Sequence, residues 1–380
     1  MRSETLCVLH LALPDDTQVL DSIARTTTVI GSLGIRQIVM LPEDGAAPAE
    51  LRALLPLAAL KPVPCSGLPP WGQVRVLLEA SRKFACDQDL YALHLHGVWP
   101  CAMGAALLQD VKPSARVLCS PHLWSTTRRP SWASVLVSRL LRHQAAMLEQ
   151  PPLAESLVEV QALSRLLNRC PDLVPRPVSG AYFHIPRREP VKPSVVADGS
   201  APDAVDLFTR LAVLLDGGER SVRFTWLGRT DDRTGAQLRA ADVELTDPAG
   251  DEGRAKILSQ AAAFVHVAAP AVLPHATAQA MAAGVPCLAS DTAAHRGLIR
   301  HGETGFICSS ERDFIEKMLL LLRDRAEAQR IGRAARAEAA RRFTFDKFRQ
   351  SMLRAYGLAE AATQRAALPL LSASREAPHE

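Results

Sequence analysis

Residues 279–306 read QAMAAGVPCLASDTAAHRGLIRHGETGF, and this stretch decides the fold. It predicts a helix that ends at Gly284, because a glycine just past a helix end and a proline soon after it stop a helix. The short apolar run Pro286–Ser290 predicts a buried strand, which a second helix and a turn around Gly302–Gly305 follow. This order of elements is typical of a parallel sheet wrapped by helices.

The same alternation of short apolar runs and longer amphipathic segments continues through the N-terminal half. Strands are predicted at Leu6–Ala12, Gln37–Leu41, Ala92–His96 and Ala115–Cys119, and helices at Asp16–Leu33, Leu51–Leu60, Gly72–Arg82, Val98–Leu108 and Ser131–Glu149. Beyond residue 194 the alternation resumes, with strands at Arg223–Gly228 and Ala263–Val267 and a last helix at Thr344–Tyr356. The pattern predicts an α/β protein.

Length and composition predict two globular domains. The chain has 380 residues, of which 48% are hydrophobic and 22% charged, enough for two ordinary cores. Prolines and charges cluster in residues 173–193, the best linker candidate. We expect domains at 1–185 and 195–343, a linker at 186–194, a crossover helix at 344–361 and a disordered tail at 362–380.

The order of residues in 279–306 resembles the nucleotide-sugar-binding core of family 4 glycosyltransferases, whose usual text is close to EAMAAGVPVVASDVGGHRELIEDGETGLL. The likeness extends from about Arg223 to Tyr356 and includes the closing helices. In the N-terminal half only LHLHGVWP (93–100) and LCSPHLWS (118–125) resemble the family. The resemblance implies two facing Rossmann-like domains, the GT-B architecture, with the last helix crossing back to the N-terminal domain.

The resemblance also implies an activity. A family 4 enzyme moves a sugar from a nucleotide-sugar donor to a glycan or lipid-linked acceptor, with retention of the anomeric configuration. Such an enzyme stabilises the leaving diphosphate with cations and with backbone N–H groups at helix N-termini. The N-terminal domain would take the acceptor and the C-terminal domain the donor. No cofactor and no metal requirement is implied.

The chain departs from the family where the chemistry should be. The family's Gly-Arg pair falls on Ala197–Asp198, and its lysine on about Asp203. An acid facing phosphate at 4 Å would oppose binding by on the order of 1–4 kcal/mol. The family's two glutamates fall on Ala271 and Gln279, and the glycine of the helix start falls on Pro274. The N-terminal glycine loop is replaced by LALPDDTQ (11–18), which brings two acids.

Several residues still match a donor site. His122 follows the fourth-strand pattern, where the family has a histidine near the reacting sugar, and a loop histidine satisfied by a backbone hydrogen bond is the alternative. Arg229 could replace a lost cation, although a solvated surface arginine is the more common reading. The full set of predicted donor-binding residues is Gly228, Arg229, His275, Thr277, Gln279, His301, Gly302 and Thr304.

His94 and His96 lie on one side of a predicted strand, because side chains alternate with a period of two. No third ligand with suitable spacing accompanies them, so we interpret them as a strand-end histidine pair and expect no metal. The eight cysteines form no C-x-x-C pair, which favours buried reduced thiols in a cytosolic protein.

The helix predicted at Ser131–Glu149 suggests a possible membrane contact. It carries both apolar and basic side chains, and two arginines precede it: Trp132, Val135, Leu136, Leu140, Met147, Arg139, Arg142, His143, Arg128 and Arg129. A basic amphipathic helix can dock on anionic lipid, although an ordinary surface helix is commoner. Residues 128–149 could thus hold a cytoplasmic protein at the inner face of the membrane. The net charge of +4 is too small to predict a nucleic-acid partner.

Two other functions remain open at this stage. The lost cations and glutamates favour a catalytically impaired glycosyltransferase-like protein that serves as scaffold or partner of an active transferase. A nucleotide-sugar epimerase on the same architecture is a weaker alternative, because its expected acid and histidine constellation is not visible.

Overall fold

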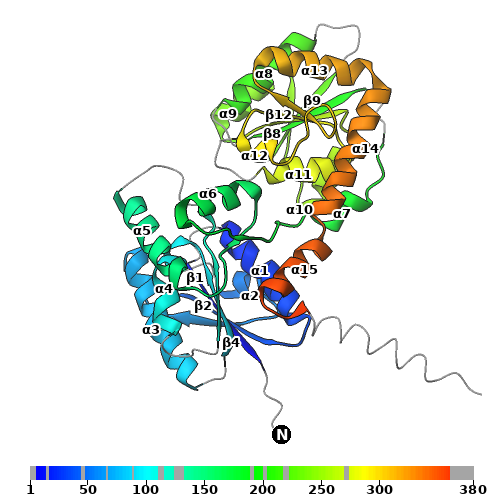
Figure 1. Cartoon of the computed structure of the whole chain (residues 1–380). Coiled ribbons are helices and arrows are strands. Elements are labelled where there is room, and N and C mark those ends of the chain that lie inside the picture. Colours follow the sequence, from blue (N-terminus) through cyan, green and yellow to red (C-terminus); the bar gives the residue numbers. More distant parts are fainter. Residues whose placement is uncertain are drawn as a thin grey trace, which may run out of the picture. The chain divides into compact units, whose positions relative to one another are not determined.

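The computed structural model describes residues 6–13, 17–43, 48–65, 67–87, 90–109, 115–123, 132–188, 192–199, 203–216, 222–268 and 274–359 (Figure 1). The chain divides into two compact units. The first comprises Met1–Arg176 and Phe348–Glu380, and the second comprises Pro177–Lys347. Each unit contains a parallel sheet covered by helices, which confirms the predicted α/β fold with two domains.

The first unit is built on a five-stranded parallel sheet in the order β3-β2-β1-β4-β5. Its strands are β1 (Cys7–Ala12), β2 (Arg36–Pro42), β3 (Ala59–Val63), β4 (Leu90–His96) and β5 (Arg116–Ser120). Its helices are α1 (Thr17–Gly31), α2 (Pro48–Leu54), α3 (Pro70–Asp87), α4 (Val98–Gln109), α5 (Trp132–Met147) and α6 (Leu157–Leu167), and the short strands β6 (Leu153–Ala154) and β7 (Asp172–Leu173) pair in parallel.

The helix predicted at Leu51–Leu60 is wrong in its second half. Helix α2 ends at Leu54, and the chain enters β3 at Ala59. Pro56 explains the break, because a proline disfavours the helical conformation of the residue before it.

The two faces of the first sheet pack against different helices. Leu9 and Leu11 share a core with α3, α4 and α5. Val8, on the opposite face, packs against α1 and against residues from the end of α15 (Phe345–Ala355). Phe348, Met352, Leu353 and Tyr356 belong to this second core, so the last helix joins the first unit, as the family resemblance implies.

The second unit is built on a six-stranded parallel sheet in the order β10-β9-β8-β11-β12-β13. Its strands are β8 (Ser194–Gly199), β9 (Arg223–Leu227), β10 (Val243–Thr246), β11 (Ala263–Val267), β12 (Cys287–Ser290) and β13 (Phe306–Cys308). Its helices are α7 (Gly180–His184), α8 (Ala204–Asp216), α9 (Asp232–Ala240), α10 (Gly250–Ser259), α11 (His275–Ala282), α12 (Ala293–Arg296), α13 (Glu311–Arg323) and α14 (Arg325–Arg342).

Two glycines allow α11 and α14 to pack closely. Gly284 follows α11 with φ +74°, a left-handed conformation that suits glycine. A Cβ on Gly332 of α14 would lie 2.3 Å from the carbonyl oxygen of Gly284, a distance that the backbone cannot accommodate without moving. The absence of a side chain at Gly332 therefore lets α14 approach the end of α11 closely.

We predict that Gly332→Ala destabilises the second unit by about 1–3 kcal/mol, because the new methyl group overpacks the contact with Gly284. Urea unfolding measures the change. Arg333→Ala, an exposed neighbour on the same helix, is the control. Alanine stabilises an ordinary helix position relative to glycine, so a more stable Gly332→Ala protein would contradict the packing argument.

Candidate functional site

In both sheets the strand order reverses beside the first strand, between β1 and β4 and between β8 and β11. Ligands of open α/β sheets bind outside the carboxyl ends of the strands at such a switch point. Asp198 on β8 pairs in register with His266 on β11, and His10 on β1 with His94 on β4. The polar groups near these four strands are therefore the first candidates for a functional site.

At the β8–β11 switch point an ion pair occupies the position where the family resemblance expects an arginine. Arg254 of α10 donates from Nη2 to Oδ2 of Asp198 at 2.8 Å, and both side chains are about three-quarters buried. Burial raises the pKa of the Asp198 carboxyl, and Arg254 opposes that rise. Asp198 is thus not a bare acid, because α10 supplies a guanidinium beside it.

The same helix places a carboxylate next to Gln279. Asp251, in the first turn of α10, accepts the hydroxyl of Tyr182 at 3.0 Å and lies 3.5 Å from Nε2 of Gln279. Burial and Asp251 raise the pKa of the Tyr182 hydroxyl, which keeps the phenol protonated. Where the family resemblance expects a glutamate on α11, this chain has an amide on α11 and an acid on α10.

Gly228 and Arg229 follow β9 at the same edge of the sheet. Gly228 has φ +124°, and its N–H donates to the carbonyl oxygen of Thr246 at 2.8 Å. A Cβ there would meet nothing within 4 Å, so the backbone conformation rather than space requires glycine. Arg229 is exposed and makes no ion pair with another described residue, which agrees with a solvated arginine.

Two predicted donor residues lie in the first turn of α11, with different burial. His275 is half-buried, directly after Pro274, which makes no side-chain capping bond. Thr277 is completely buried, and its hydroxyl lies 2.8 Å from Nδ1 of His266. The Thr277 hydroxyl therefore already contributes to the core of the unit, and its role in donor binding stays a prediction.

Residues His301–Gly305 form a turn held by its own hydrogen bonds. The N–H of Gly302 donates to the carbonyl oxygen of Gly305 at 2.8 Å, and Gly302 has φ +78°. The Thr304 hydroxyl accepts the N–H of Arg300 at 2.9 Å, and Nδ1 of His301 accepts the N–H of Ile307 at 3.2 Å. His301 is exposed, whereas Thr304 is buried, so of these two only His301 presents its side chain to solvent.

In the first unit, His122 belongs to a buried polar cluster. It follows β5 with φ +52°, is 1% exposed, and holds Nδ1 at 3.9 Å from Oε1 of Glu155. Although burial raises the pKa of Glu155, Arg25, His122 and Arg176 together hold it below its ordinary value. His122 thus faces an ionised carboxylate, an arrangement that orients an imidazole.

A second buried acid lies beside this carboxylate. Glu159 accepts the backbone N–H groups of Glu155 and Leu123 at 2.8 and 3.0 Å. Burial raises the pKa of Glu159 to about 8, against the effect of those two donors. The cluster therefore holds two carboxyl groups whose environments shift their pKa values in opposite directions.

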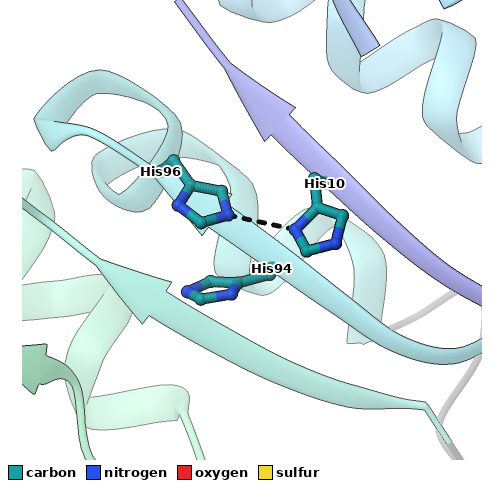
Figure 2. Close-up of side chains that lie close together, drawn as sticks. All are labelled: His10, His94 and His96. Atoms are coloured by element: carbon teal, nitrogen blue, oxygen red, sulfur yellow. Dashed lines mark hydrogen bonds between the residues drawn. The ribbon is translucent and has the colours of Figure 1, made fainter. Parts of the chain in front are cut away.

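The histidine pair of β4 has a third neighbour that the sequence did not indicate. His10 of β1 lies beside His94 and His96, and Figure 2 shows the three rings gathered over the two strands. One ring nitrogen from each residue lies within 4.8 Å of the others. The expectation that no third ligand accompanies His94 and His96 is therefore wrong, because a neighbouring parallel strand provides it.

Sequence reasoning missed Asp251, Arg254, Tyr182, Glu155 and His10. Asp251 and Arg254 stand three positions apart on α10, which places them on one helix face. His10 and His94 carried a signal, since a histidine in each of two predicted strands can pair across a sheet. Ala271 and the acids of residues 14–16 lie outside the described residues.

Comparison with known proteins shows what the chain is similar to. Residues 192–324 match the family described as glycosyl transferases group 1. A phosphatidyl-myo-inositol mannosyltransferase of Mycobacterium leprae is 24% identical over 302 residues, which cover 72% of this chain and 75% of that protein. The chain is similar to glycosyltransferases of the group 1 type.

Solved structures show that the chain has the GT-B fold. HepE of Anabaena, in complex with UDP and glucose, aligns with a TM-score of 0.70 and 14% identity over 92% of this chain and 98% of its own. The sucrose-phosphate synthase of Thermosynechococcus elongatus aligns with a TM-score of 0.68 and 15% identity, over 94% of this chain and 100% of its own. In the part of the chain that the structure describes, no helix combines the length and apolar character needed to cross a bilayer.

We predict that acid destabilises the second unit through His266 and His295. Nδ1 of His295 donates to the carbonyl oxygen of Ser290 at 2.7 Å, so its Nε2 lone pair faces Nδ1 of His266 at 3.0 Å. Burial lowers the pKa of His295 to about 4, and burial together with His295 lowers that of His266 to about 3, both from 6.5. The unfolded chain therefore binds more protons, and the stability of the neutral pair is complete above pH 6.5 and lost as the pH falls toward 4.

Chemical unfolding across this pH range tests the prediction. His295→Asn should be less stable at neutral pH, and its stability should fall less steeply with acid than that of the parent. His184→Asn, at an exposed position of the same unit, is the control and should retain the parent slope. An unchanged slope in His295→Asn would mean that the pair does not control the acid response.

Proposed function

We propose that this protein is a catalytically active glycosyltransferase that transfers a sugar, with retention, from a nucleoside diphosphate donor to a lipid-linked acceptor. The second unit would hold the donor and the first the acceptor, with His122 near the reacting centre. UDP-sugars are the first donors to test, because the neighbouring HepE structure contains UDP and glucose. A lipid-linked acceptor is favoured because the Mycobacterium leprae relative is a phosphatidyl-myo-inositol mannosyltransferase.

The observation that carries this proposal is the pair of charges on α10. An arginine has five N–H donors, so Arg254 can keep Asp198 on one side and still donate to a phosphate oxygen. A guanidinium matches phosphate geometry and stays charged at all working pH values. Arg254 would thus replace the cation that the family has at position 198, with Asp198 holding it in place.

Asp251 and Gln279 would provide the second half of the donor site. The Gln279 amide donates toward Asp251, which leaves its carbonyl oxygen and the second carboxylate oxygen of Asp251 to accept from ribose hydroxyls. Tyr182 donates its hydroxyl to the same carboxylate oxygen, Oδ1, which helps to orient Asp251. The acid that binds ribose would therefore come from α10 instead of from α11.

The predicted consequence is a large loss of donor affinity in Arg254→Ala. A hydrogen bond between charged groups contributes about 1.5–3 kcal/mol, so we expect UDP binding to weaken about tenfold to a hundredfold. Lys256→Ala, an exposed cation on the same helix, is the matched control and should bind like the parent. Isothermal titration calorimetry with UDP and UDP-glucose makes the measurement.

Two further results decide between this proposal and a scaffold role. Asp198→Ala should fold and still bind UDP, because Arg254 remains and the acid is removed. If the parent protein binds no nucleotide even at millimolar concentration, catalysis by the isolated chain is excluded and the scaffold role becomes the better account. If the parent protein binds UDP but Arg254→Ala binds it equally well, the proposed role of Arg254 as the phosphate-binding cation is wrong, while the proposed transferase activity is not contradicted.

We further propose that α5 brings the first unit to the inner face of an anionic membrane. Its Val135, Leu136 and Met147 side chains are about half exposed, and Leu140 is 36% exposed. At 100° per residue these four positions fall on one side of the helix, with Arg139 and His143 between them. Buried Val137 and Leu141 point the opposite way, so the apolar surface is additional to the core stripe. Arg128 and Arg129 lie outside the described residues.

The double variant Leu136→Ser, Leu140→Ser should reduce binding to vesicles of phosphatidylglycerol and phosphatidylcholine about tenfold, because inserted apolar groups are lost. Co-sedimentation measures it. Leu214→Ser in α8 of the second unit is the matched control, since Leu214 is more exposed than either. Equal loss in the control would show that exposed leucines act without regard to position.

A further inference from the structure

The three histidines at the β1–β4 switch point form a buried cluster of ring nitrogens outside the proposed donor site. His10, His94 and His96 are all 0% exposed. Nδ1 of His10 lies 3.1 Å from Nε2 of His96, and the His94 and His96 rings are 3.9 Å apart between centroids. Figure 2 shows His10 on its own strand, turned toward the two histidines of β4. Three strong ligands thus converge without solvent.

The hydrogen bonds around His10 fix which of its nitrogens carries the proton. The Gln37 amide nitrogen donates to the carbonyl oxygens of Thr27 and Leu57 at 2.8 and 3.3 Å, so the Gln37 amide cannot be flipped. Its Oε1 therefore accepts from Nε2 of His10 at 3.2 Å. The Nδ1 of a neutral His10 must then be a lone pair, and it faces His96.

His96 makes the cluster incomplete as a set of hydrogen bonds. If His96 donates from Nε2 to the His10 lone pair, its own Nδ1 becomes a buried acceptor. That Nδ1 has no hydrogen-bond partner among the described residues. With the proton on Nδ1 instead, that N–H is equally without a partner among the described residues, so neither tautomer satisfies the ring by hydrogen bonds alone. An alternative is that both facing nitrogens are lone pairs that share a cation.

We propose that His10, His94 and His96 bind one divalent transition-metal ion, with Zn²⁺ as the best match. Zinc–nitrogen bonds of about 2.0–2.1 Å at tetrahedral angles separate two ligand nitrogens by about 3.3 Å, close to the His10–His96 distance of 3.1 Å. His94 joins with one ring nitrogen, within the 4.8 Å limit of the cluster.

The surroundings of the cluster resemble the outer shell of a metal site. Metal-ligating histidines usually donate their second ring nitrogen to a carbonyl, which orients the ring. His10 does so to Gln37. The two ring nitrogens of His94 lie 2.8 Å from the hydroxyl oxygens of Tyr356 and Ser120. When one of these nitrogens binds the ion, the other keeps its hydroxyl partner. Burial lowers the pKa of all three histidines, so they are neutral ligands at physiological pH.

A metal here would join elements that are distant in the sequence. It would bind β1 to β4 and, through His94 and Tyr356, fix the end of α15 on the first unit. The ion would therefore act on the stability of this unit, and it is independent of whether the donor site works. The buried position argues for a structural ion, because exchange with a substrate requires access.

The test measures zinc in the full-length protein with Cys86 and Cys170 replaced by alanine, since these exposed thiols would also bind the metal. After chelator treatment, we expect uptake of one zinc per chain, a higher unfolding midpoint with the ion, and tetrahedral Co²⁺ absorption bands. His10→Gln and His96→Gln should lose all three, while His143→Gln, at an exposed position on α5, should retain them.

If neither His10→Gln nor His96→Gln folds, measurements on the parent protein still test the proposal. Zinc added to the stripped parent must raise its unfolding midpoint, and Ser120→Ala, which leaves all three histidines in place, must still bind one equivalent. A stripped parent whose midpoint does not respond to Zn²⁺, Co²⁺ or Ni²⁺ overturns the proposal and leaves a hydrogen-bonded histidine cluster. Uptake that persists in both His10→Gln and His96→Gln also overturns it.

Discussion

Both sheets are parallel and covered by helices on each face, so every polar side chain that a central strand carries must find a partner inside the protein. This constraint determines how the switch points are built. His10 depends on Gln37, His94 on Ser120 and Tyr356, and His266 on Thr277 and His295. Each partner comes from another element: Gln37 and Ser120 lie on neighbouring strands, Thr277 and His295 on helices, and Tyr356 just after α15. Buried polar networks of this kind specify one arrangement, because a shifted register would leave the groups unpaired.

The same constraint explains how the fold accommodates charged residues at positions that differ from those of the family. Asp198 lies on β8 where a bare carboxylate would be costly, and Arg254 of α10 neutralises it at 2.8 Å. Once an acid occupies position 198, a cation within reach is needed for stability as well as for any anionic ligand. Asp251 and Gln279 form a comparable pair across α10 and α11. A helix next to the switch point can therefore supply both charges that the neighbouring strand and helix lack.

The sequence predicted the α/β class and most elements, because glycine, proline and apolar periodicity act locally. Gly284 and the run from Pro286 to Ser290 gave the helix end and strand correctly. Contacts between distant elements could not be predicted in this way. Nothing near Asp198 in the sequence indicates Arg254, which lies 56 positions later. The prediction that His94 and His96 have no third ligand was wrong for the same reason. His10 lies on β1, and only the register between β1 and β4 places it beside His94.

Residues 279–306 resemble the family closely, whereas the charged positions of the expected donor site do not. The two observations are compatible, because the first set of residues is needed for folding and the second for binding. Gly284 is needed for a positive φ and for the approach of Gly332, whatever the protein binds. Gly302 and Thr304 complete a turn through their own hydrogen bonds, and the Thr277 hydroxyl is hydrogen-bonded to His266. These residues would be retained in a protein without any catalysis. Arg254 and Asp251 differ from these residues, because both hold partially solvated charges beside a switch point. The charged residues of α10, and not the motif that reveals the fold, therefore distinguish a donor site from a mere scaffold in this protein.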